Sequence, residues 1–138
     1  MAVSTMVRAQ PLIAVKDGRA SSQWYRELLG AGSLPEHSHR DVYDRVQCAG
    51  QLILQLHAWD EEDHPNLTNA DAARPGHGVL LWFEVSNFDE VVERAGALHA
   101  QVILESHVNP RPHHREIWLR DPDGYVVVIA SLDGEATS

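Results

Sequence analysis

Residues 13–17 read IAVKD and residues 83–87 read FEVSN, and this partial repeat decides the fold. Each stretch is a short apolar run, which is typical of a strand, and it ends on an Asp or Asn that can cap a helix. Amphipathic stretches follow over residues 20–29 and 91–98, and further apolar runs come after each of them. The sequence therefore predicts two copies of one unit, whose equivalent side chains line one shared cleft.

The first unit contains a helix whose ends are marked in the sequence. Asp17 precedes apolar residues that recur at helical spacing, and Gly30 follows them, so these two residues are expected to begin and end the helix. Leucine alternates with other residues over 51–57. Because side chains alternate along a strand, we expect the leucines on one face and Gln55 and His57 on the other.

The second unit repeats this order. Asn87 is expected to cap its helix, with Glu90 three residues later as the partner of a capping box. Residues 107–114 contain prolines and are expected to form a loop. Asp121-Pro122-Asp123-Gly124 suits the tight turn of a hairpin. Strands are expected over residues 10–16, 42–48, 51–57, 79–85, 100–105, 116–120 and 125–130.

These elements predict an α+β fold. Two tandem βαβββ modules form one curled mixed sheet around a cleft, with the helices outside, because neither module can bury both faces of its sheet alone. The 138 residues suit a single domain, 1–138. Module one spans about residues 8–58, a linker spans 59–77, and module two spans about 78–131.

Composition excludes several classes of function. The net charge of −9 disfavours nucleic acid as a partner and permits a cationic ligand, although the charge alone favours plain solubility as its role. No apolar run approaches the roughly 20 residues of a membrane span, and the first ten residues lack the apolar region of a secretory signal. The single cysteine, Cys48, excludes an internal disulfide. We therefore expect a cytoplasmic protein with no membrane partner.

The pattern resembles the vicinal oxygen chelate superfamily, which holds glyoxalase I, extradiol dioxygenases, fosfomycin-resistance enzymes and bleomycin-resistance proteins. Two segments carry the resemblance: Asp17 through Trp24-Tyr25 to Leu29-Gly30, and RDPDGY at residues 120–125. The resemblance covers about residues 9–131. It implies the paired βαβββ fold and a cleft in which metal-dependent members hold an ion.

The resemblance also implies where metal ligands would stand. The four positions fall on Gln10, on Gln55 (or Leu54 in the other register), on Leu80 and on Val128. Leucine and valine have no lone pair to donate, and two neutral amides are too few ligands for zinc, nickel or iron. We therefore expect no metal ion and no other cofactor at these positions.

A closer resemblance is to the bleomycin-resistance branch, which is metal-free and sequesters drugs. Trp82-Phe83-Glu84-Val85 and Arg115-Glu116, leading into the turn at 120–122, are similar to segments of those proteins. They are acidic homodimers that hold a cationic, planar ligand in a groove between subunits. The resemblance implies a homodimer that binds a small molecule, whether the cleft is completed within one chain or between two.

Seven residues are expected to contact the ligand: Gln10, Gln55, His57, Leu80, Trp82, Glu84 and Val128. Trp82 offers an aromatic surface for stacking or for a cation, or is simple core. Glu84 attracts a cation, or is a carboxylate in solvent at the end of a strand. His57 is a hydrogen-bond donor, a general base or a wall residue.

Two other functions stay open on the sequence. The first is a metal-dependent enzyme of the glyoxalase or dioxygenase type, a lyase, isomerase or oxidoreductase with displaced ligands, for which His57, His77 and His113 are the candidates. The second is metal-free acid–base catalysis by His57 with Glu84. The residues name no natural substrate for either function.

Overall fold

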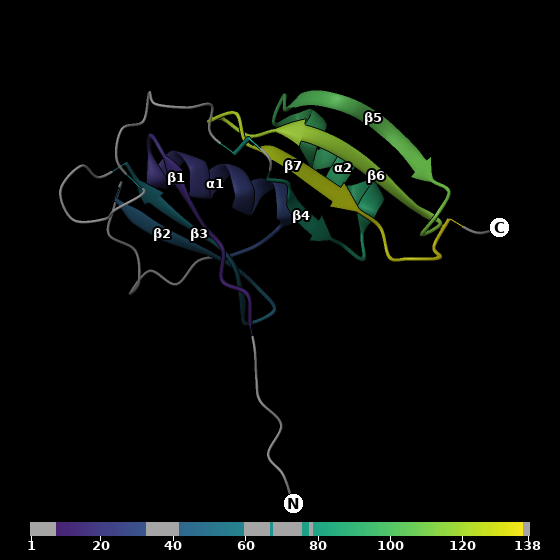
Figure 1. Ribbon diagram of the computed structural model, residues 1–138, viewed down its shortest axis with the longest axis horizontal. Coiled ribbons are helices and arrows are strands. Elements are labelled where there is room, and N and C mark those ends of the chain that lie inside the picture. The colour runs from purple at the N-terminus through teal and green to yellow at the C-terminus, as the bar shows by residue number, and fades with distance from the viewer. Residues whose placement is uncertain (1–7, 33–41, 60–66, 68–75, 78, 137–138) are drawn as a thin grey trace, which may run out of the picture.

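The computed structural model describes residues 8–32, 42–59, 67, 76–77 and 79–136 (Figure 1). The elements, in chain order, are β1 (Leu12–Val15), α1 (Gly18–Leu29), β2 (Tyr43–Cys48), β3 (Gln51–Ala58), β4 (Leu81–Glu84), α2 (Phe88–Ala97), β5 (Gln101–Asn109), β6 (His114–Arg120) and β7 (Val126–Ala130). The α+β class and the tandem order of the two halves are confirmed. Most of the predicted linker lies outside the described residues.

The described strands form two sheets, ordered β1-β3-β2 and β4-β7-β6-β5 (Figure 1). In each half the first strand pairs in parallel with the last strand, β1 with β3 and β4 with β7. The last strand then pairs with the preceding strand in antiparallel fashion, β3 with β2 and β7 with β6. This shared topology is the structural form of the repeat in the sequence.

The helix boundaries follow from the capping residues. Oδ1 of Asp17 accepts hydrogen bonds from the backbone N–H groups of Arg19 and Ala20 at 3.0 and 3.1 Å, and Gly30 ends α1 in the left-handed region at φ 66°. The predicted capping box of α2 is wrong. Asn87 does stand at the N-cap of α2, but its side chain makes no bond to the helix backbone, and its Nδ2 donates to Oε2 of Glu90 at 3.1 Å.

The loop predicted over residues 107–114 is also wrong in its extent. His107, Val108 and Asn109 continue β5 and pair with Glu116, Arg115 and His114 of β6. Only residues 110–113 make the turn, which begins where Pro110 can no longer donate a backbone hydrogen bond. The extension places two histidines on paired strands, where the sequence analysis had them in a loop.

Both halves share one hydrophobic core. Fully buried Tyr25, Leu54 and Val127 belong to the same cluster, and α1 contacts α2. The turn before β7 binds the first half directly, since Tyr125 Oη donates to the Ala14 carbonyl at 2.8 Å. Asp123 of that turn accepts from Ser21 Oγ at 2.9 Å. The two halves are therefore fixed relative to each other by buried contacts.

None of the helices in the described part of the chain has the length and apolar character of a membrane span.

Candidate functional site

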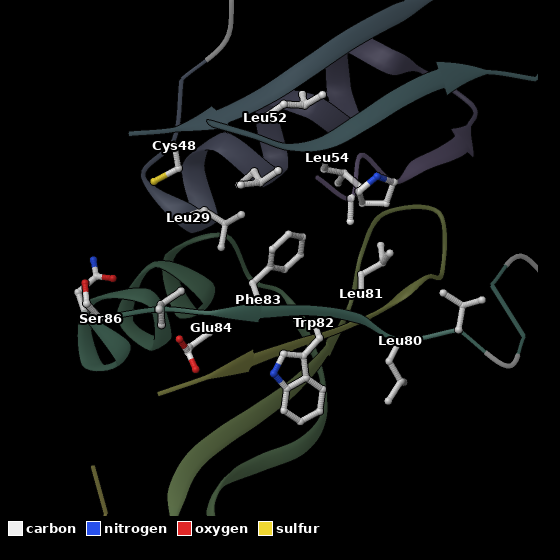
Figure 2. A pocket seen from close by; sticks show the side chains of 16 residues that line it. Leu29, Cys48, Leu52, Leu54, Leu80, Leu81, Trp82, Phe83, Glu84 and Ser86 are labelled. Carbon is white, nitrogen blue, oxygen red and sulfur yellow. The ribbon is translucent and has the colours of Figure 1, made fainter. Parts of the chain in front are cut away.

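Each sheet has one face toward the shared core and one face turned away from it. Figure 2 shows this alternation on β4: Leu81 and Phe83 point toward Leu54 of the first half, whereas Trp82 and Glu84 point the other way. We call the outward faces the first and second open faces. The first open face carries Leu12, Ala14, Tyr43, Arg45, Gln55 and His57, and the second carries Trp82, Glu84, Leu104, His107, Glu116, Trp118, Val128 and Ala130.

The first open face carries a chain of polar side chains. Gln55 Nε2 donates to the Gln10 carbonyl at 3.0 Å, and Gln55 Oε1 accepts from Tyr43 Oη at 2.6 Å. Arg45 Nε donates to Tyr43 Oη at 2.7 Å, and its guanidinium carbon lies 5.8 Å from the centre of that ring. These bonds hold an amide, a phenol and a cation side by side. The sequence analysis found Gln55 but not Tyr43 or Arg45.

His57 lies on the same face, as the alternation predicted, but it is only 9% exposed. Its Nδ1 is 2.7 Å from the carbonyl of Ala58, and its ring centre is 6.1 Å from that of Tyr43. Because a carbonyl only accepts, Nδ1 carries the hydrogen in this contact. Burial and this bond favour the wall residue among the three roles considered for His57.

The second open face is organised in two rows. Trp82 and Trp118 both have Val128 as their partner in the ladder, so the two indoles flank this buried valine. In the next row, Glu84 and Glu116 flank Ala130. A row with two tryptophans is thus followed, along the same three strands, by a row with two glutamates. Trp82 is 46% exposed, so it is not a core residue.

Glu116 is the centre of a polar cluster that the sequence analysis missed. Trp118 Nε1 donates to Oε1 of Glu116 at 3.0 Å, and His107 Nε2 lies 3.3 Å from the same oxygen. His114 Nε2 lies 2.6 Å from Oε2, which Asn109 Nδ2 also approaches at 3.5 Å. The signal available in the sequence was an acidic residue on the same alternating face as Trp118.

The charges in this cluster support one another. Burial opposes ionisation of Glu116, but hydrogen bonds from His114, Trp118 and Asn109 outweigh burial and lower its pKa. Burial likewise opposes the imidazolium of His114, but hydrogen bonds to Glu116 and Asp133 outweigh it and raise the pKa of His114. The Trp82 ring centre lies 5.9 Å from that of His114. The cluster therefore reaches both tryptophans of the second open face.

The structure brings the predicted ligand residues together in two groups. Trp82, Glu84 and Val128 share the second open face, and Leu80 lies just before β4 with 45% of its surface exposed. Gln55 and His57 share the first open face, where Gln10 joins them through its backbone carbonyl. Within one chain the two groups do not face each other, because both open faces turn away from the shared core.

A groove of about 680 Å³ runs between β4 and the first sheet (Figure 2). Its lining is mainly apolar and includes Leu29, Leu52 and Phe83, with Cys48 and Glu84 among the more polar residues. Cys48 is exposed and has a free thiol. The groove follows the edge of β4 and so lies beside the second open face.

The described residues contain no group of three or more His, Cys, Asp or Glu side chains arranged to hold a metal ion. Of the four positions that the resemblance implies as ligands, Leu80 is exposed and Val128 is fully buried. His77 and His113, candidates for a displaced site, are both exposed. His57 is buried on the first open face, so these three histidines form no such group.

Solved structures similar to this chain share its fold. TioX from Micromonospora sp. ML1 has 15% sequence identity and a TM-score of 0.69 over 91% of this chain and 98% of its own. Lactoylglutathione lyase from Agrobacterium tumefaciens has 20% identity and a TM-score of 0.66 over 92% and 94% of the two chains. A glyoxalase/bleomycin resistance protein/dioxygenase family enzyme from Burkholderia phytofirmans PsJN has 17% identity and a TM-score of 0.66, over 89% and 96%.

No curated protein matches the sequence. A family model does match, over residues 7–129, which is most of the chain. The tandem modules, the parallel pairing of first and last strands in each half and this match agree with one another. The chain therefore belongs to the glyoxalase/bleomycin resistance protein/dioxygenase superfamily.

Proposed function

We propose that this protein binds a small aromatic or cationic molecule without a metal ion and acts in antibiotic resistance by sequestering a bleomycin-like drug. The observation that carries the proposal is the make-up of the second open face. A half-exposed Trp82 stands beside Glu84, and aliphatic Leu80 and Val128 occupy the positions where metal-dependent relatives hold ligands. Such a face binds by contact and charge rather than by coordination.

The chemistry of Trp82 and Glu84 favours a cationic guest. An exposed indole attracts a cation through its ring face, typically by about 0.5–1 kcal/mol and by more when water is excluded. Glu84 is exposed and lies on the same face of the same strand, two residues away. A planar cation stacked on the indole would therefore have a carboxylate within its reach.

The site needs a second wall, and we propose that a second copy of the chain provides it. The first open face carries the guanidinium of Arg45, whereas the second carries the exposed carboxylate of Glu84. The two faces are thus complementary in charge, and charge complementarity guides association. Leu12 is 40% exposed on the first face, so each face also offers apolar surface to its counterpart. A homodimer would form two equivalent clefts.

Calorimetric titration tests the binding proposal. We expect heat and a raised melting temperature with bleomycin, a cationic glycopeptide, and with ethidium, a planar cation. Naphthalene disulfonate, a planar anion, serves as the control and should give neither effect. Failure of both cations, under conditions where the protein is dimeric, would contradict the proposal.

Sedimentation velocity tests the dimer separately. The expected species has twice the mass of the chain, 15.4 kDa, and it should dissociate when Arg45→Glu places like charges on the two faces. A charge-neutral control, Gln47→Asn on the same strand, should leave the dimer intact. If the protein is a monomer at the concentrations used for binding, the proposal that a second copy completes the site is wrong.

The alternative is a metal-dependent lyase, isomerase or oxidoreductase with displaced ligands. The lyase from Agrobacterium tumefaciens is only 20% identical to this chain, so its likeness shows the fold and does not favour an enzyme. Elemental analysis of the purified protein discriminates between the two functions. A stoichiometric zinc, nickel, manganese or iron that EDTA removes with loss of ligand binding would favour the enzyme.

A further inference from the structure

We infer that Glu116 is the positioning residue of the second open face, which fixes the indole of Trp118 and the imidazoles of His107 and His114 in the geometry that receives the ligand. This inference rests on the proposed function. It adds a residue that contacts no ligand itself and acts through its neighbours.

Glu116 lies on the same face of the sheet as the ligand residues. It pairs with Ala130, which also pairs with Glu84, so the two glutamates occupy the same row on β6 and β4. Glu84 is exposed, whereas Glu116 is only 3% exposed. Glu116 therefore lies beside the surface that Trp82 and Glu84 present, but it is buried.

The lone pairs of the carboxylate are used by its neighbours. Oε1 accepts from Trp118 Nε1 at 3.0 Å and lies 3.3 Å from His107 Nε2. Oε2 lies 2.6 Å from His114 Nε2 and 3.5 Å from Asn109 Nδ2. Both carboxylate oxygens therefore have hydrogen-bonded neighbours, from Trp118 on Oε1 and from His114 and Asn109 on Oε2, and the ring of His107 lies next to Oε1.

The neighbours of Glu116 reach the surface where Glu116 does not. The side chain of His107 is 41% exposed, and the ring of Trp118 is half-buried next to Val128. His114 is buried, but its ring centre is 5.9 Å from that of Trp82. One buried carboxylate thus sets the orientation of groups on three sides of the ligand face.

The Nδ1 atoms of His107 and His114, which point away from Glu116, also have polar contacts. His114 Nδ1 lies 3.2 Å from Oδ1 of Asp133, and His107 Nδ1 lies 2.8 Å from the carbonyl of Glu105. Because each of these contacts offers the ring an acceptor, rotation of either imidazole would break two contacts instead of one. Both imidazoles are therefore in contact at both of their ring nitrogens.

The conservative variant Glu116→Gln tests the inference. The amide keeps the size of the side chain but offers only one acceptor oxygen to donors on both sides. We expect the affinity for ethidium, measured by calorimetry well below the melting temperature, to fall at least tenfold. That loss corresponds to one hydrogen bond to a charged group. Glu93→Gln, an exposed glutamate on α2, is the matched control and should leave the affinity unchanged.

A spectroscopic measurement separates positioning from a purely structural role. The indole N–H signal of Trp118, identified by its loss in Trp118→Phe, should exchange slowly with solvent in the wild type. In Glu116→Gln that signal should shift and exchange faster, while the other indole signals stay in place. A lower melting temperature with both the signal and the affinity unchanged would show a structural role only and would overturn the inference.

Two further variants keep the test decisive if Glu116→Gln does not fold. His107→Ala and Trp118→Phe each remove one donor of the cluster and leave the carboxylate in place. Each should weaken ethidium binding, and the signal of Trp118 should shift in His107→Ala. If the wild type binds ethidium and neither variant binds it more weakly, the positioning inference fails while the proposed function stands. If the wild type binds no cation, the proposed function itself fails.

Discussion

Tyr25 on α1 donates a 2.6 Å hydrogen bond from its hydroxyl to Oδ2 of Asp121, which begins the turn before β7. Both side chains are buried, and the bond joins the first half of the chain to the second. Oδ1 of Asp121 meanwhile accepts from the backbone N–H groups of Asp123 and Tyr125, so one carboxyl shapes the turn and anchors it to the helix.

Tyr25→Phe removes the hydroxyl from this bond and leaves Asp121 with one acceptor unsatisfied. Because hydrogen bonds to charged groups contribute about 1.5–3 kcal/mol, the free energy of unfolding should fall by about that amount in urea denaturation. Tyr43→Phe also removes a hydroxyl, which bonds Gln55 and the charged Arg45, but this site is only half-buried and water can replace the lost partners, so the loss should be smaller than for Tyr25→Phe. Equal losses in the two variants would contradict a special role for the Tyr25 bond.

Gly30→Ala should destabilise the protein, whereas Gly96→Ala should not. Gly30 ends α1 at φ 66°, a conformation that disfavours side chains, and an added Cβ would lie 2.6 Å from Nη1 of Arg94. The Arg94 side chain can move aside, so we expect a loss of about 1 kcal/mol, chiefly from the backbone. Gly96 lies within α2 with open space around its Cβ, and alanine there should stabilise by up to about 1 kcal/mol. Thermal and urea unfolding of the two variants should give opposite signs.

Stability should depend on pH through His114 and Glu116. The pKa of His114 is raised in the folded state, so its contribution is complete below its ordinary value of 6.5 and is lost as the pH rises through the raised pKa. The pKa of Glu116 is lowered, so its contribution is complete above 4.5 and is lost as the pH falls through the lowered pKa. Both contributions are therefore complete between about pH 4.5 and 6.5.

The comparison of wild type with His114→Gln isolates this dependence. The difference in free energy of unfolding should be largest between about pH 4.5 and 6.5, and it should shrink as the pH rises through the raised pKa of His114, where the imidazolium loses its proton. Urea denaturation over a rising series of pH values measures the difference. A difference that does not shrink at any alkaline pH at which the protein stays folded would contradict a stabilising charge on His114.

Trp82→Ala should weaken ligand binding with little loss of stability. Trp82 is 46% exposed, so its removal opens no large cavity, whereas loss of a stacked cation should lower the affinity for ethidium roughly twofold to fivefold. Trp24→Ala is the converse control, because Trp24 packs edge-on against Tyr25 at 4.9 Å within the core of the first half. It should lower the melting temperature and leave the affinity of the folded protein intact. If Trp24→Ala weakens ethidium binding and Trp82→Ala does not, the ligand does not bind at the second open face.

Local signals in the sequence predicted most of the fold. Asp17 and Gly30 mark the ends of α1 through local interactions. Asp17 accepts hydrogen bonds from backbone N–H groups two and three residues later, and Gly30 adopts the left-handed conformation that ends the helix. The alternation of leucines in β3 likewise gave the correct faces, since strand geometry depends only on the order of side chains. Asn87 stands at the N-cap of α2 as predicted, but the capping box was wrong, because the side chains of Asn87 and Glu90 bond to each other and Asn87 makes no side-chain bond to the helix backbone.

The candidate site was less predictable because it depends on contacts between distant segments. Trp82 and Glu84 were found from the motif around them, but the importance of Glu116 appears only when His107, at the far end of β5, is brought beside it by the ladder. Which face of each sheet is open depends on how the two halves pack against each other. That packing cannot be predicted from any short stretch of sequence.

The exposed strand β5 has a practical consequence for handling the protein. Val102, Ile103 and Leu104 are 38%, 38% and 45% exposed there, so β5 presents apolar surface on an edge strand, which tends to recruit other chains. Mutual repulsion of the negatively charged molecules opposes such recruitment, but it vanishes near the isoelectric point of about 5.3. That value falls inside the interval where the pair of His114 and Glu116 is fully formed. The acidity at which this pair contributes fully to stability is thus one at which native molecules should precipitate most readily, and storage buffers belong on the alkaline side of it.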